Sequence, residues 1–89
     1  MEMAIDEILK KFISEEKGIN IDDISNDISL LESGMIDSIN MVQILSFIEE
    51  QFSIKVEDNE LIPENFDTIN SIFNLIKRKL PDNSTNNNS

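Results

Sequence analysis

One serine lies where its hydroxyl could carry a covalent group. Ser38 follows Asp37 directly, and residues 34–38 are typical of a loop that ends at the start of a helix. Asp37 is a good N-cap because its carboxylate can accept amide hydrogens of the first turn. Ser38 is then the first helical residue, and a phosphate on its hydroxyl would meet the positive end of the helix. By itself, however, a serine in this position more often only supports the cap.

The residue types that most enzymes use are missing. The chain has no cysteine and no histidine, so disulfides, thiolate sites and the commonest general base are excluded. An acidic run does occur at Asp22, Asp23 and Asp27, but its spacing does not match a calcium-binding loop. We therefore expect no catalytic residue, no metal site and no enzymatic activity.

The charge of the chain limits its partners. Eighteen acidic and seven basic residues give a formal charge of −11. Such a surface repels nucleic acid and anionic membranes and attracts basic patches on proteins. Because no targeting or membrane-spanning segment is visible, we expect a cytoplasmic monomer without direct nucleic-acid or membrane contact.

Hydrophobic spacing predicts an all-α fold. Apolar residues recur at helical intervals over residues 2–17, 38–52 and 69–80, and Pro63 begins a single short turn. We expect a small four-helix bundle of three long helices and one short one. Polar residues alternate with apolar ones between residues 19 and 36, which indicates a long loop lying across the core. The predicted domain is residues 1–80, followed by a disordered tail at residues 81–89.

The helix after Ser38 has one broad apolar face and two apolar residues outside it. The predicted face comprises Met41, Val42, Ile44, Leu45, Ile48 and Phe52. Ile39 lies among polar residues beside the serine, which favours contact with a partner, although the long loop could instead cover it. The second outlier, Phe47, receives no role from the pattern.

Three segments together resemble the acyl carrier protein family, which includes peptidyl and aminoacyl carrier domains. Residues 37–39, Asp-Ser-Ile, resemble the family's Asp-Ser-Leu signature. Residues 49–54 resemble the acidic end of the second helix and the following Phe-Gly-Ile, with Ser53 in the glycine position. Residues 65–69 are similar to the start of the last helix. The resemblance covers about residues 2–80 and implies the carrier fold.

The resemblance also implies a cofactor and partners. A phosphopantetheinyl transferase would attach 4′-phosphopantetheine from coenzyme A to Ser38, and Asp37 would help to orient the transferase's metal and cofactor. The arm's thiol would hold an acyl or aminoacyl group as a thioester for an adenylate-forming ligase, a synthase or a transferase. Partner contacts are expected at Ile39, Met41, Gln43 and Glu49.

One motif bears on the pathway in which such a carrier would act. The spacing from Gly34 to Asp37 resembles D-alanyl carriers and stand-alone carriers loaded by adenylate-forming ligases. It favours a specialised pathway: nonribosomal peptide, polyketide or cell-envelope modification. The interior between the second and last helices could shelter an acyl chain. The alternative is an acidic helical adaptor that keeps the fold but has no prosthetic group.

Overall fold

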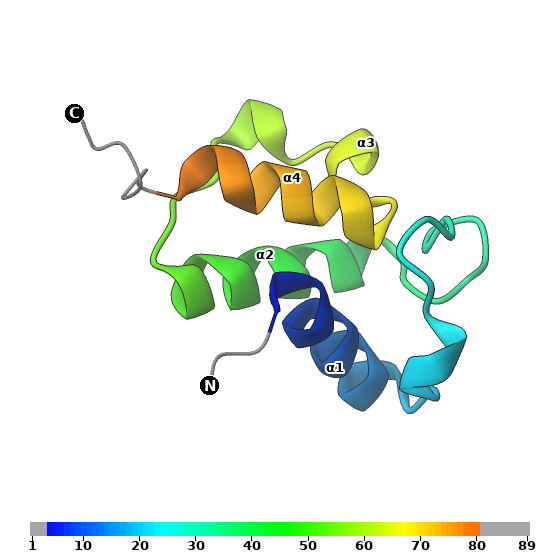
Figure 1. The fold of residues 1–89 in the computed structure, drawn as a ribbon. Helices are drawn as coiled ribbons and strands as arrows, with labels where there is room; N and C mark the ends of the chain where they lie inside the picture. The colour runs from blue at the N-terminus through cyan, green and yellow to red at the C-terminus, as the bar shows by residue number, and fades with distance from the viewer. Residues whose placement is uncertain (1–3, 81–89) are drawn as a thin grey trace.

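The computed structural model describes residues 4–80, which contain four α-helices and two short 3-10 turns. The order is α1 (Ile5–Lys17), η1 (Ile21–Asp23), α2 (Ser38–Phe52), η2 (Asp58–Glu60), α3 (Pro63–Phe66) and α4 (Ile69–Lys79). In the view of Figure 1, α2 lies between α4 and α1. This is the predicted small bundle of three long helices and one short one.

The helix ends follow from local sequence. Gly18 ends α1 in the left-handed conformation, at φ 67°, which glycine adopts without steric cost. Thr68 caps α4 by accepting a hydrogen bond from the Ser71 amide at 2.9 Å. Asp67 and Thr68 are both residue types that cap helices, and the structure assigns the cap of α4 to Thr68.

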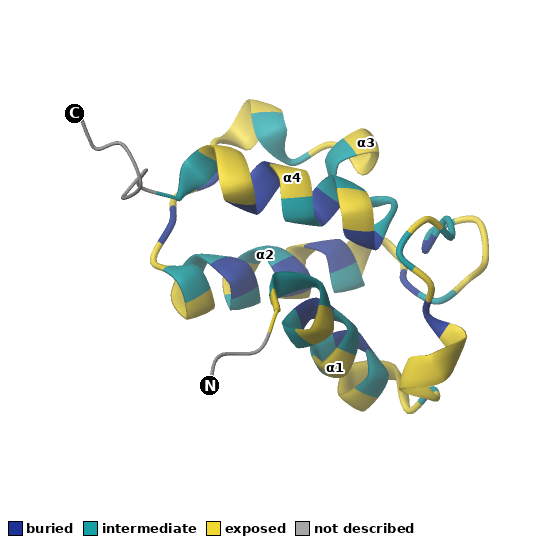
Figure 2. Ribbon diagram, in the orientation of Figure 1, coloured by how far each residue is buried: buried dark blue, intermediate teal, exposed yellow. Residues whose placement is uncertain are grey.

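A single apolar core joins the helices and the long loop. Figure 2 shows buried positions recurring along α2 and α4, whereas η1 is exposed. The loop contributes Ile24, Leu30 and Ile36 to this core, each at most 3% exposed. As predicted, residues 19–36 therefore lie across the helices. The buried residues are Leu9, Ile13, Ile24, Leu30, Ile36, Met41, Ile44, Ile48, Ile54, Val56, Phe66, Ile69, Ile72, Leu75 and Ile76.

The segment after α2 packs on the helices through alternate residues. Ile54 and Val56 are buried, and the Val56 amide donates to Glu49 Oε2 at 2.8 Å. The two 3-10 turns were not predicted, because three residues are too few to establish a period.

Two parts of the sequence-based description fall outside residues 4–80. They are the first residues of the predicted N-terminal helix and the predicted tail at residues 81–89. Among the described helices, none has the length and apolar character needed to cross a membrane.

Candidate functional site

Ser38 is the first residue of α2, and its side chain is exposed. Asp37 precedes it in an extended conformation and caps the helix through Oδ1, which accepts the Asn40 amide hydrogen at 2.9 Å. Asn40 returns the interaction, because its Oδ1 accepts the Asp37 amide hydrogen at 2.9 Å. This capping box holds the residues on both sides of Ser38 while leaving the hydroxyl accessible.

Asn40 also connects the start of α2 to its surroundings. Its side-chain amide donates to Gln43 Oε1 at 2.8 Å, one turn further along the helix. Lys17, the last residue of α1, donates from Nζ to Asn40 Oδ1 at 3.0 Å. The C-terminal end of α1 is therefore tied to the first turn of α2.

The loop before Ser38 needs a glycine at one point. Gly34 has φ 82°, a conformation that a residue with a Cβ adopts only with strain. Two residues later Ile36 is buried, and its amide donates to the Leu30 carbonyl at 3.1 Å. The chain therefore passes from a buried anchor to the exposed Asp37–Ser38 pair within two residues.

The surface beside Ser38 is partly apolar. Ile39 is 70% exposed, so the long loop does not cover it. Val42, one turn further along α2, is 51% exposed. This corrects the prediction that Val42 belongs to the buried face: residues 39 and 42 are three apart and share one side of the helix. Gln43 is exposed beside them.

Met41 and Glu49, two of the predicted partner contacts, are less exposed than Ile39 and Gln43. Met41 is 7% exposed and belongs to the core, because it points inward with Ile44 and Ile48. Little of its side chain is therefore available to a partner, and a partner contact at Met41 stays a prediction. Glu49 is half-buried, and one carboxylate oxygen is used by the Val56 amide. The interaction fixes the segment after α2, a structural role that the motif did not indicate.

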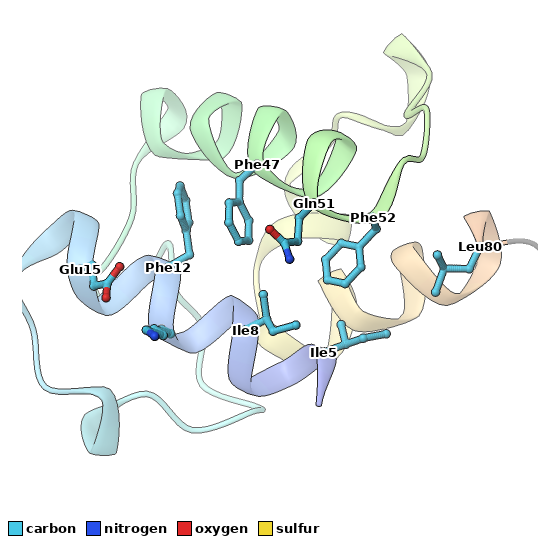
Figure 3. A pocket seen from close by; sticks show the side chains of 9 residues that line it. Ile5, Ile8, Phe12, Glu15, Phe47, Gln51, Phe52 and Leu80 are labelled. Atoms are coloured by element: carbon cyan, nitrogen blue, oxygen red, sulfur yellow. The ribbon is translucent and has the colours of Figure 1, made fainter. Parts of the chain in front are cut away.

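The far side of α2 carries an apolar cleft of about 750 Å³ between α1, α2 and the end of α4 (Figure 3). Phe47 lines it and stacks on Phe12, with ring centroids 4.1 Å apart and planes at 16°. This gives Phe47 the role that its position on the helical wheel left open. Ser38 and Phe47 are nine residues apart, about two and a half turns, and so lie on opposite faces of α2. The cleft does not lie on the side of the helix that bears the hydroxyl.

The described charges around Ser38 suit a singly charged phosphodiester. The hydroxyl stands at the positive end of a 15-residue helix, and Lys17 reaches the same turn. Within residues 4–80, no group of three or more Asp or Glu residues is arranged to hold a metal ion.

Comparison with known proteins identifies relatives of the whole folded region. Residues 7–76 match the family model described as "Phosphopantetheine attachment site". The acyl carrier protein of Buchnera aphidicola subsp. Baizongia pistaciae is 34% identical over 74 residues, which are 83% of this chain and 92% of that protein. A chain in the structure titled "Crystal structure of FAD-dependent dehydrogenase" is 32% identical, with a TM-score of 0.66, over 76% of this chain and 97% of that one.

Proposed function

The chain belongs to the acyl carrier protein family, whose members carry 4′-phosphopantetheine, and from this premise we propose that Ser38 is the attachment residue. The observation that carries the proposal is the exposed hydroxyl at the first position of α2, framed by the Asp37–Asn40 capping box. The protein is a carrier and not a catalyst. The arm supplies a thiol, which this cysteine-free sequence lacks, to hold an acyl group as a thioester.

For attachment, the carrier needs only to expose the Ser38 hydroxyl to the transferase. Ser38 Oγ forms the bond to phosphorus, the nucleotide portion of coenzyme A leaves, and the transferase accepts the hydroxyl proton. Asp37 has one carboxylate oxygen in the capping box, and we assign its second oxygen to orienting the transferase's metal and cofactor. The helix N-terminus favours the phosphodiester once it has formed.

The partner surface that we propose begins with the exposed apolar pair Ile39 and Val42, with Gln43 beside it. An apolar contact buried in a complex contributes in proportion to its area, and a highly exposed isoleucine has most of its area available. The acyl carrier family works with phosphopantetheinyl transferases and with enzymes that load or process the acyl group. Docking on Ile39 and Val42 would bring such an enzyme next to the arm.

A specialised pathway remains our proposal for this carrier, on the basis of the Gly34-to-Asp37 spacing. The cargo would be loaded by an adenylate-forming ligase and processed by a synthase or transferase. The similar chain in a structure titled as an FAD-dependent dehydrogenase adds flavin enzymes to the partners worth testing. We further propose that residues 1–80 form the carrier domain and that the protein acts as a cytoplasmic monomer.

The test is the intact mass of the protein after incubation with coenzyme A, magnesium and a phosphopantetheinyl transferase of broad specificity. We expect the wild type and Ser46→Ala to gain one phosphopantetheinyl group and Ser38→Ala to gain none. Ser46 is an exposed serine on the same helix, which makes it the matched control. A wild type that stays unmodified would instead support an adaptor without a prosthetic group.

A further inference from the structure

The Asp67 carboxylate accepts hydrogen bonds from the long loop and does not cap a helix. It lies between the end of α3 and Thr68, which caps α4. Asp67 Oδ1 accepts hydrogen bonds from Ser29 Oγ at 2.7 Å and from the Leu31 amide at 3.3 Å. Its backbone carbonyl accepts the Leu30 amide hydrogen at 2.6 Å. One residue thus holds three consecutive positions of the long loop.

These hydrogen bonds continue to the attachment site. The Leu30 carbonyl accepts the Ile36 amide hydrogen at 3.1 Å, and Ile36 directly precedes Asp37. The connection runs from the Asp67 backbone carbonyl through Leu30 to Ile36, two residues before Ser38. The Asp67 carboxylate holds the two neighbours of Leu30, Ser29 and Leu31, and so keeps Leu30 in place. The interaction spans the fold, because residues 29 and 67 are 38 positions apart in sequence.

The hydrogen bonds of Asp67 lie in a partly buried part of the fold, which strengthens them. Leu30 and Phe66 are both completely buried, and the Ser29 and Leu31 contacts to Asp67 are partly buried. Hydrogen bonds to a charged acceptor that are shielded from water contribute more than exposed ones. Ser29 Oγ also accepts the Glu32 amide hydrogen at 3.1 Å, so the contact orders the loop on both sides of Leu30.

We propose that Asp67 is a positioning residue for phosphopantetheine attachment, which it supports by holding the loop that places Asp37 and Ser38. The proposal rests on Ser38 being the attachment residue. Without the Asp67 carboxylate the loop would sample other conformations, and only a fraction of molecules would present the site correctly. Apparent affinity falls in proportion to that fraction, while the chemical step in the bound complex is unchanged.

The test measures steady-state kinetics of attachment for wild type, Asp67→Ala, Asp67→Asn and Asp58→Ala, at a temperature where each is folded by circular dichroism. We expect Asp67→Ala to raise the KM for the carrier by about three- to tenfold, the loss of one or two shielded hydrogen bonds, with kcat within about twofold. Asp67→Asn retains the oxygen acceptor without its charge, so its KM should lie between those of wild type and Asp67→Ala. Asp58 is exposed, and Asp58→Ala makes the same charge change away from the loop.

A second measurement does not depend on the transferase. Amide hydrogen exchange of the unmodified protein should be faster at Leu31 and Ile36 in Asp67→Ala, and intermediate between wild type and Asp67→Ala in Asp67→Asn. If Asp67→Ala does not fold, Ser29→Ala removes one donor only and should show the same two changes to a smaller degree.

The outcomes separate this inference from the proposed function. A wild type that is modified, together with a folded Asp67→Ala whose KM and exchange are unchanged, would overturn the role of Asp67 alone. A loss confined to kcat, or an Asp67→Asn as impaired as Asp67→Ala, would also overturn it. If Ser29→Ala is used instead, an unchanged KM and unchanged amide exchange would likewise overturn the role of Asp67. Failure of the wild type to be modified would overturn both.

Discussion

Two hydrogen bonds of 2.9 Å between Asp37 and Asn40 frame the residue that we assign to attachment. They fix the backbone on either side of Ser38 without using its hydroxyl. A side chain at the first position of a helix contributes little packing, so this residue can be modified without disturbing the core. Different residues therefore stabilise the site and react: Asp37 and Asn40 stabilise the helix start, and the Ser38 hydroxyl is free to be modified.

We predict that Asp37→Ala destabilises the protein. Loss of an N-cap side chain costs about 1 kcal/mol, which in a domain of this size lowers the melting temperature by about 4–8 °C. Thermal unfolding followed by circular dichroism measures it. Asp22→Ala, an exposed aspartate in η1, should shift the midpoint much less. Equal shifts in the two variants would contradict the capping role.

The sequence predicted the start of α2 better than the surface around it. Local rules placed Asp37 as the cap and Ser38 in the first turn, because caps depend on neighbours in the chain. The attachment role of Ser38 came from the family resemblance and stays a proposal. Val42 was wrongly placed on the buried face because the apolar arc of α2 is wider than the face that the other helices cover. Which edge of such an arc is buried depends on tertiary packing, and no single helix encodes it. The contacts of Asp67 with residues 29–31 could not be predicted from local rules, because they are long-range.

Among the elements, α2 ends in an unusual way. Ser53 has φ 56° and is the one non-glycine residue with positive φ among those described. Its amide donates to the Glu49 carbonyl and so closes the helix. A residue with a Cβ in this conformation is strained by about 1–2 kcal/mol, and helices commonly end here with glycine.

We therefore predict that Ser53→Gly stabilises the protein. Relief of strain outweighs the larger chain entropy of unfolded glycine, and the free energy of unfolding should rise by about 0.5–1 kcal/mol. Urea denaturation measures the change. The same substitution at Ser46, in the interior of α2, should have the opposite sign, about 0.5 kcal/mol of destabilisation. Destabilisation by both variants would show that the strain is not significant.

An ion pair between α4 and η2 predicts that the stability of the protein depends on pH. Lys79 at the end of α4 pairs with Glu60 of η2, and this hydrogen bond holds the pKa of the Glu60 carboxyl below its usual value of 4.5. Because the pKa is lower in the folded state, the stabilisation is present above the unfolded pKa and is lost as pH falls through the folded one.

Melting temperatures of wild type and Glu60→Gln should therefore differ most near pH 7 and converge as the pH drops below about 4. The wild type should be the more stable protein at the higher pH. Glu64→Gln, an exposed glutamate on α3, serves as the control for the charge change. A difference between wild type and Glu60→Gln that stays constant down to about pH 3 would exclude the ion pair as its source.

The elements were predictable to the extent that they are periodic. α1, α2, α3 and α4 were all expected from spacing, proline and caps, and the loop at residues 19–36 was correctly placed across the core from its scattered isoleucines and leucines. Its internal course could not be predicted, because it is set by contacts with residues far along the chain, such as Leu30 with Asp67.

For the whole molecule, charge and apolar contact should make separable contributions to docking. A formal charge of −11 attracts a basic partner over distances that salt screens. The exposed pair Ile39 and Val42 acts only at contact. Long-range attraction governs encounter, whereas burial of the apolar pair governs how long the complex lasts.

Salt should distinguish these contributions. We predict that raising ionic strength from about 0.02 M to 0.3 M lowers kcat/KM for attachment severalfold, because the Debye length falls below the separation of most surface charges. Ile39→Ala should lower kcat/KM by a factor that is nearly the same at both salt concentrations. An Ile39→Ala effect that disappears at high salt would contradict an apolar contact at this position.

The position of the prosthetic group in the modified wild-type protein is the most direct evidence for or against attachment at Ser38. Tandem mass spectrometry of peptides from the treated chain should place a single 4′-phosphopantetheinyl group on Ser38 at the start of α2. Finding that group on another serine, such as Ser33 in the preceding loop, or finding no modified peptide at all, would contradict it.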